Sequence, residues 1–194
     1  MMNTLDAHVS KWNLLQHPFY QAWSQGTLPV SALQAYAREY GAFIATLPQG
    51  WLALGDAASA EVEVEHARLW DQFAAALETR VVGQATTVQV AALVATAKQL
   101  FASKASALGA LYAFEVQQPA TAASKLEGLE THYKSLPQGV RPYFVAHAEE
   151  TCEKDMILAQ IATLSAEDRL VCSAACETMS KALWDALTGL HPSC

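Results

Sequence analysis

Residues 14–48 read LLQHPFYQAWSQGTLPVSALQAYAREYGAFIATLP and contain the start and stop signals of two helices. Pro18 and Pro29 suit the beginning of a helix, where a backbone N–H has no partner to lose. Gly26 suits the residue that follows a helix, because glycine adopts positive φ at little cost. Apolar residues recur at helical spacing between these signals. The stretch therefore predicts a short helix over 18–25 and a long one from 29 to about 54, ending at Gly55.

The remainder of the chain shows the same helical spacing of apolar residues. Pro119 lies inside one such run and should kink the helix at the preceding turn, because proline removes a backbone donor. Ser165, three residues before Asp168, resembles the capping pattern of a helix start. The sequence predicts an all-α protein of seven to eight helices, with one domain over 1–194. The other expected helices cover about 4–15, 58–79, 87–103, 106–134, a segment ending near 163, and 166–190.

Composition and charge indicate which kinds of binding partner the protein lacks. The net charge is −7, with 12 Lys and Arg among 19 Asp and Glu, so the clustered basic residues that bind phosphates are lacking. No apolar run is long enough to span a membrane, and the first residues do not resemble a secretory signal. We expect a cytoplasmic protein that binds neither nucleic acid nor membrane.

All four cysteines lie in the last quarter of the chain, which is unlike a framework of disulfides that staples distant segments. We expect reduced thiols. Cys172 and Cys176 are four residues apart on an expected helix and could present two soft metal ligands. Small, buried core residues are the favoured interpretation of this pair.

Four segments stand out in order along the chain: residues 14–48, EHARLWDQFAAAL at 65–77, LYAFEVQQPATAASKLEGL at 111–129, and YFVAH at 143–147. Together they resemble the heme-oxygenase-like superfamily, in particular its CADD, PqqC and TenA-type proteins, with the CADD-like group nearest. The resemblance implies a helical bundle around a central pocket and a homodimer.

CADD-like members hold two irons, so the resemblance also implies metal ligands at matching positions. His66, Glu115 and His147 match ligand positions of the family. The other three ligand positions hold Ser59, Thr151 and Lys154. Because half of the set is missing, we expect no metal in the protein as purified, whereas relatives with the full set contain iron.

Two interpretations of this altered set stay open. Lys154, in a pocket with Glu115 and His147, could replace the missing metal as the cation that balances Glu115. Alternatively, Glu63, three residues before His66, or Glu150, three after His147, could restore metal binding, because a Glu/His pair at i,i+3 presents two ligands together.

The resemblance further implies reactive side chains. Relatives that make p-aminobenzoate are thought to consume their own residues, with a tyrosine as the source of the ring and a lysine as the amino donor. The matching positions are Tyr20, Tyr36 and Lys125. Each could instead be an ordinary core or surface residue.

The favoured function is therefore that of a CADD/PqqC-like protein related to oxidases of cofactor biosynthesis, of the p-aminobenzoate or quinone cofactor type. A non-catalytic protein that binds a small molecule or a partner is the alternative. A TenA-like hydrolase acting on thiamin fragments is less favoured: Glu39 and Glu177 could stand in for its two acids, but residues 1–151 contain no cysteine to act as the nucleophile. Glu39 is expected to line the pocket.

Overall fold

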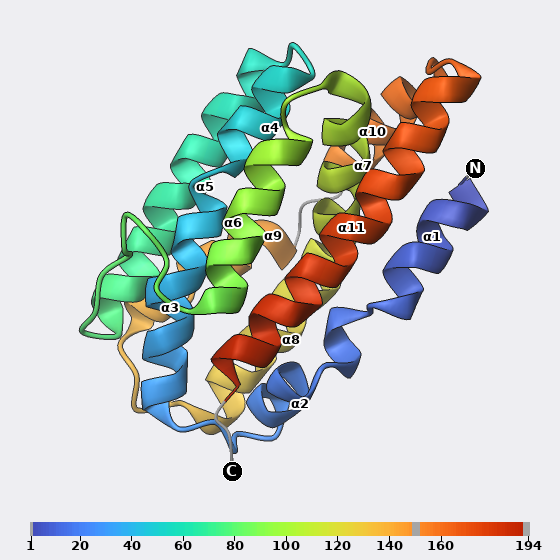
Figure 1. Ribbon diagram of the computed structural model, residues 1–194. Coiled ribbons are helices and arrows are strands. Elements are labelled where there is room, and N and C mark those ends of the chain that lie inside the picture. Colours follow the sequence, from blue (N-terminus) through green and yellow to red (C-terminus); the bar gives the residue numbers. More distant parts are fainter. Residues whose placement is uncertain (1, 149–151, 192–194) are drawn as a thin grey trace.

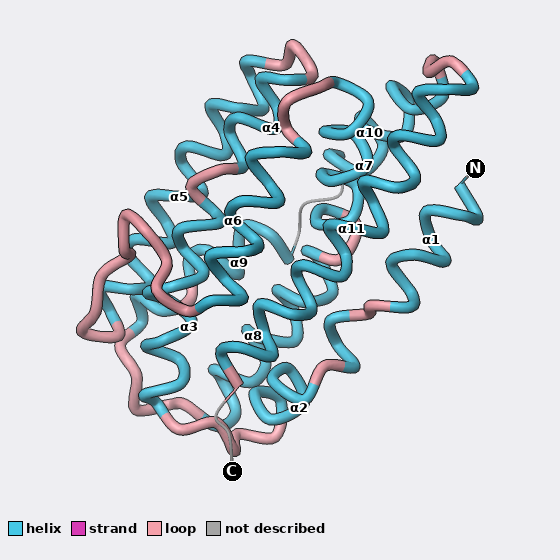
Figure 2. The backbone as a smooth tube through the Cα atoms, viewed as in Figure 1, coloured by secondary structure: helices cyan, strands magenta, loops and turns pink. Residues whose placement is uncertain are grey.

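The computed structural model describes residues 2–148 and 152–191, which form a bundle of α-helices (Figure 1). Figure 2 shows helices and loops but no strand in this part of the chain, which confirms the all-α prediction. The α-helices are α1 (Met2–Lys11), α2 (Pro18–Ser24), α3 (Val30–Ile44), α4 (Leu47–Ala53), α5 (Ala57–Ala76), α6 (Val88–Leu100), α7 (Lys104–Glu115), α8 (Gln118–His132), α9 (Pro142–Ala148), α10 (Cys152–Ala162) and α11 (Ala166–Leu190). Two short 3-10 helices, η1 (Leu14–Gln16) and η2 (Gln138–Val140), join them.

Two of the long expected helices are each divided into two segments. The run from 29 to 54 is interrupted between α3 and α4, where Pro48 lies in the first turn of α4. The run over 106–134 is interrupted before Pro119, which lies in the first turn of α8. Proline is tolerated there because no hydrogen bond is lost. The run ending near 163 contains α9 and α10.

Helix α7 lies at the centre of the bundle, where every residue from Ala105 to Glu115 is buried. It packs against α11, which runs the length of the molecule in Figure 1. A Cβ atom at Gly109 would lie 1.9 Å from the carbonyl oxygen of Cys172. Glycine at this position therefore allows the two helices to approach backbone to backbone.

The HPFY segment begins helix α2 and fixes its orientation. The Nδ1 atom of His17 accepts a hydrogen bond from the N–H of Phe19 at 3.0 Å, which caps the helix. With Nδ1 as acceptor, Nε2 carries the proton and donates to the Thr188 hydroxyl on α11 at 3.0 Å. Burial lowers the pKa of His17 to about 4, so the neutral ring is the form that caps α2.

Aromatic side chains from helices α2, α3, α5 and α9 fill the interior around the site. The rings of Tyr36 and Trp70 lie 5.2 Å apart, and those of Phe73 and Phe144 lie 5.1 Å apart, both edge to face. The rings of Trp23 and Phe144 are also nearly perpendicular, with their centroids 6.0 Å apart. Such packing buries large apolar areas and holds each ring in one orientation.

None of the helices in the described residues is both long and apolar enough to cross a membrane.

Candidate functional site

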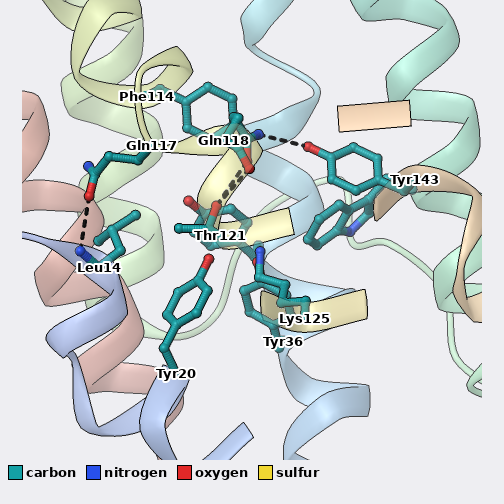
Figure 3. A pocket seen from close by; sticks show the side chains of 11 residues that line it. Leu14, Tyr20, Tyr36, Phe114, Gln117, Gln118, Thr121, Lys125 and Tyr143 are labelled. Atoms are coloured by element: carbon teal, nitrogen blue, oxygen red, sulfur yellow. Dashed lines mark hydrogen bonds between the residues drawn. The ribbon is translucent and has the colours of Figure 1, made fainter. Parts of the chain in front are cut away.

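The amine of Lys125 lies among aromatic rings inside the bundle (Figure 3). Lys125 is 3% exposed, and its Nζ atom donates a hydrogen bond to the hydroxyl of Tyr36 at 2.9 Å. The same atom lies 4.9 Å from the ring centroid of Tyr20 and 5.2 Å from that of Phe144. Helices α2, α3 and α8 thus bring Tyr20, Tyr36 and Lys125, the three residues with implied catalytic roles, to one place.

Burial determines the protonation of this group of side chains. It lowers the pKa of Lys125 to about 7, because the ammonium form loses its hydration. It raises the pKa of Tyr20 and of Tyr36 above the ordinary value. Near neutral pH the site therefore contains neutral phenols beside an amine that is partly unprotonated and nucleophilic.

The backbone around Lys125 is held by Trp23 of α2. The indole Nε1 of Trp23 donates to the carbonyl oxygen of Lys125 at 3.1 Å. Three residues further along α8, a Cβ at Gly128 would lie 2.6 Å from Trp23 Cδ1. The glycine makes room for the indole, so Gly128 allows Trp23 to reach the backbone of Lys125.

The cavity around these groups is small. It has a volume of about 10 Å³ and is lined by 11 residues, among them Tyr20, Tyr36, Thr121, Lys125 and Tyr143. A space of that size accommodates about one water molecule. The side chains themselves therefore occupy the interior of the site.

Tyr143 of α9 forms the wall between this cavity and a second cluster of polar residues. Its hydroxyl accepts a hydrogen bond from Nε2 of Gln118 at 3.2 Å. Its ring stacks on the imidazole of His147, with the two ring centroids 4.1 Å apart. The centroid of that imidazole lies 4.2 Å from the centroid of the His66 ring. The phenol and amine cluster and the imidazole cluster are thus adjacent.

The second cluster contains carboxylates and imidazoles. Glu63 and His66 come from α5, and Glu153 comes from α10; these three offer ligand atoms that all lie within 4.8 Å of one another. His66 and Glu63 are one turn apart, with Nδ1 of His66 3.3 Å from Oε1 of Glu63. His147 is 1% exposed and Glu115 is 3% exposed.

The chemistry of these donors fits a divalent metal ion. The Nδ1 atom of His147 donates to the carbonyl of Tyr143 at 2.8 Å, which leaves Nε2 unprotonated. Burial lowers the pKa of His147 to about 3, so the ring is neutral. Neutral imidazole and carboxylate oxygen together are ligands of Fe²⁺ and Mn²⁺.

An outer cavity gives access to this cluster from the surface. It has a volume of about 210 Å³ and is lined by residues that include Glu115, Gln118, His147 and Glu153. Gln118 also lines the inner cavity. A small molecule entering from solvent therefore meets the carboxylates and imidazoles before it meets Lys125.

Lys154 also lines the outer cavity, but its side chain is exposed to solvent. The prediction that its amine replaces a buried metal cation beside Glu115 is therefore wrong. A flexible stem lets its ammonium stay hydrated at the rim. The buried lysine of the site is Lys125. Thr151 and Glu150, which the sequence also singled out, lie outside the described residues.

Glu39 is buried, as expected, but it has a different role from the one expected. Its carboxylate accepts hydrogen bonds from the N–H of Thr86 at 2.7 Å, the Thr86 hydroxyl at 2.8 Å and the N–H of Thr87 at 3.0 Å. Glu39 therefore ties α3 to the start of α6, where a negative charge is favourable. The expectation that it lines the pocket is not met, because its oxygens are used in this cap.

Ser59, at one of the altered ligand positions, also has a structural partner. Its N–H donates to Oδ1 of Asp56 at 3.0 Å and its hydroxyl donates to Oδ2 at 2.8 Å, so it belongs to the cap of α5. The sequence does not single out Glu153, because a charged residue on a helix usually faces solvent. The YFVAH segment contains Tyr143 but gives it no role by itself. The position of Tyr143 four residues before His147, on the same helix face, was the available signal.

Comparison with known proteins agrees with this architecture. Residues 5–77 match the TENA/THI-4/PQQC family. The chain is 30% identical to a 4-aminobenzoate synthase of Chlamydia pneumoniae over 166 aligned positions, covering 75% of this chain and 73% of that protein. It is 28% identical to a 4-aminobenzoate synthase of Nitrosomonas europaea, covering 96% of this chain and 89% of that protein. A solved domain of unknown function from Shewanella denitrificans, described as having a heme oxygenase-like fold, superposes with a TM-score of 0.77 at 15% identity, covering 98% of this chain and 91% of that one.

The helical bundle that encloses this site is thus that of the heme-oxygenase-like class of proteins. Within that class, the chain belongs to the TENA/THI-4/PQQC family, and it is a relative of proteins named 4-aminobenzoate synthase.

Proposed function

We propose that this protein forms 4-aminobenzoate from one of its own tyrosine side chains and the amine of Lys125. The names of its relatives support the product, and the resemblance to CADD-like proteins supports the use of the chain's own residues. The observation that carries the proposal is the 2.9 Å contact between the Lys125 amine and the Tyr36 hydroxyl.

The position of the amino group in 4-aminobenzoate connects this contact to the reaction. In 4-aminobenzoate the amino group occupies the ring position that carries the hydroxyl in tyrosine. An amine held at the hydroxyl end of a tyrosine is therefore next to the carbon that must gain nitrogen and lose its oxygen as water. The Cε–N bond of Lys125 must break in return. The Cα–Cβ bond of the tyrosine must also break, so that Cβ becomes the carboxylate carbon, with dioxygen accepting the electrons. Tyr36 is within hydrogen-bond distance of Lys125, and the ring of Tyr20 faces the same nitrogen at 4.9 Å.

The small inner cavity supports the same proposal. A volume of about 10 Å³ has no room for a separate aromatic substrate beside Tyr20, Tyr36 and Lys125. Close packing holds the amine near its target, and such positioning accelerates reactions between neighbouring groups. The surrounding rings exclude water from the amine and keep part of it unprotonated.

A metal bound at Glu63, His66, Glu115, His147 and Glu153 would supply the activation of dioxygen that an oxidation of this kind needs. Tyr143, between that cluster and the inner cavity, keeps the two apart at a fixed spacing. Gln118 holds the Tyr143 hydroxyl, so it orients this wall.

A TenA-like hydrolase is disfavoured by the placement of the described thiols. Cys172 and Cys176 are buried on α11, and burial raises the pKa of their thiols to about 11 and about 12. A nucleophilic cysteine needs a lowered pKa. Neither residue lines the inner cavity.

The test is growth of a bacterium that cannot make 4-aminobenzoate. The wild-type chain should restore growth, and Lys125→Arg should abolish it, because a guanidinium cannot donate its nitrogen in the same way. Tyr36→Phe and Tyr20→Phe identify the source of the ring: cells fed ring-labelled tyrosine should release labelled 4-aminobenzoate, and peptide mass analysis should find the consumed residue.

Two matched controls keep this test specific. Tyr112→Phe removes another buried phenol, one that bonds to Asp6, and Lys98→Arg changes an exposed lysine of α6. Both should restore growth as the wild type does. Growth with Lys125→Arg equal to that of wild type, or no growth with the folded wild type supplied with iron and manganese, contradicts the proposal.

A further inference from the structure

Glu63 is a buried carboxylate, and one of its oxygens has no hydrogen-bond partner among the described residues. The residue is 0% exposed, and its Oε1 atom lies 3.3 Å from Nδ1 of His66. Its Oε2 atom is buried and accepts no hydrogen bond from any residue in the described part of the chain. An unsatisfied carboxylate oxygen in the interior destabilises the fold, as does a buried ion without its partner.

The arrangement around Glu63 suggests what the oxygen binds. Ligand atoms of Glu63, His66 and Glu153 lie within 4.8 Å of one another, close enough to surround one ion. The ring of His147 is 4.2 Å from that of His66, on the same side of the cluster. The outer cavity reaches Glu153 and His147, so an ion can enter from solvent.

The positions of these ligands differ from those that the resemblance implied. Position 59, one of the ligand positions that the resemblance implies, holds a serine that caps α5 with Asp56. Glu63 follows one helical turn later and so lies near the same face of the helix. Position 154, another implied ligand position, holds an exposed lysine, and the adjacent Glu153 contributes to the cluster instead.

We propose that this chain binds a divalent metal ion of the Fe²⁺ or Mn²⁺ class through relocated ligands, with Glu63 and Glu153 acting together with His66. Two carboxylates and an imidazole form a hard donor set, which favours these ions over thiol-seeking ones. This replaces the expectation that the altered ligand positions leave the protein without metal. The proposal is independent of the formation of 4-aminobenzoate.

A purely structural interpretation predicts a different behaviour of Glu63. If Glu63 only paired with His66, its loss would destabilise the protein, because the pair would be broken. If Glu63 is a metal ligand, the change to glutamine removes a negative charge that nothing compensates in the metal-free protein. The variant without metal should then be more stable than the wild type without metal. The sign of the change in stability therefore separates the two interpretations.

The experiment measures metal binding directly. The purified chain, stripped with a chelator, is titrated with Mn²⁺ under anaerobic conditions, and the free ion is followed by its electron paramagnetic resonance signal. Thermal unfolding with and without Mn²⁺ provides a second measurement, because an ion that binds the native state raises the midpoint. Glu63→Gln and Glu153→Gln are compared with Glu61→Gln, whose side chain is exposed two residues away on the same helix.

We expect the wild type and Glu61→Gln to bind Mn²⁺ with equal affinity. Glu63→Gln and Glu153→Gln should each weaken binding by about tenfold to a hundredfold or more. Glu63→Gln should unfold at a higher temperature than wild type without metal and lose the rise that Mn²⁺ causes. Absence of binding by wild type, binding by both variants equal to that of wild type, or equal weakening by Glu61→Gln each overturns the proposal. A chain that binds metal through Glu63 but makes no 4-aminobenzoate contradicts only the proposed function.

Discussion

The Lys125 amine lies 2.9 Å from the Tyr36 hydroxyl, although 89 residues separate the two in the sequence. The side chains of Tyr36 on α3 and Lys125 on α8 meet here because aromatic side chains pack around both residues. Trp23 contacts the Tyr36 ring at 5.8 Å and also bonds to the backbone of Lys125. One indole therefore positions both reactive groups.

The burial of Lys125 predicts a stability that depends on pH. Its pKa is about 7 in the folded protein and 10.5 ordinarily, so between these values the unfolded chain binds more protons. The wild type then gains stability as pH rises through this window, by about 1.4 kcal/mol per unit, and carries the full penalty below it. Lys125→Met should be more stable than wild type near neutral pH, with a difference that shrinks towards pH 10.5.

Urea denaturation of both proteins at several pH values between about 6 and 10 measures this difference. A gain in stability that is the same at every pH would show that packing, and not the charge of Lys125, causes it.

The cap formed by His17 predicts a second dependence on pH. Its pKa is about 4 in the folded protein and 6.5 ordinarily, so the unfolded chain binds more protons between these values. This contribution to stability is present above pH 6.5 and is lost as pH falls to about 4. His17→Asn keeps an acceptor for the N–H of Phe19 but does not titrate. The slope of unfolding free energy against pH in this window should be smaller in the variant, by about 1.4 kcal/mol per unit at most.

The close approach of α7 and α11 predicts that Gly109 does not tolerate a side chain. The Cβ of alanine would lie 1.9 Å from the carbonyl oxygen of Cys172, and backbone cannot yield as a flexible side chain can. Gly109→Ala should cost about 3 kcal/mol or more in unfolding free energy, as overpacked cores do. Gly83→Ala is the control, because nothing lies within 4 Å of its Cβ position. Similar midpoints of thermal unfolding for the two variants would contradict this account of the helix crossing.

The cap formed by Glu39 predicts a local effect on helix α6. Burial raises the pKa of Glu39, but hydrogen bonds from Thr87 and Thr86 outweigh this, and the net pKa is below the ordinary value. The stabilisation is therefore present above pH 4.5 and is lost as pH falls below it. Glu39→Gln should cost about 1–2 kcal/mol. Hydrogen exchange should become faster at the start of α6, whereas Glu130→Gln, an exposed change on α8, should leave it unaltered.

The sequence by itself determined the class of fold and the approximate extent of the helices. Both depend on local features: the spacing of apolar residues, prolines in first turns and glycines after last turns. The cap at Ser165 was predicted for that reason, and the kink predicted at Pro119 is a full break between α7 and α8. The sequence motifs also indicated Tyr20, Tyr36 and Lys125 as reactive positions, but they gave no information on how close these residues lie.

The tertiary structure decided which charged side chains are buried. Glu61, Glu63 and Glu65 look alike in sequence, yet only Glu63 among these three is buried, because it faces the helices that pack against α5. Lys125 and Lys154 differ in the same way: one lies under aromatic rings from α2, α3 and α9, and the other faces solvent. Helical spacing places a residue on a face, but the free energy of its charge depends on what other segments bring to that face, which is a property of the packed chain.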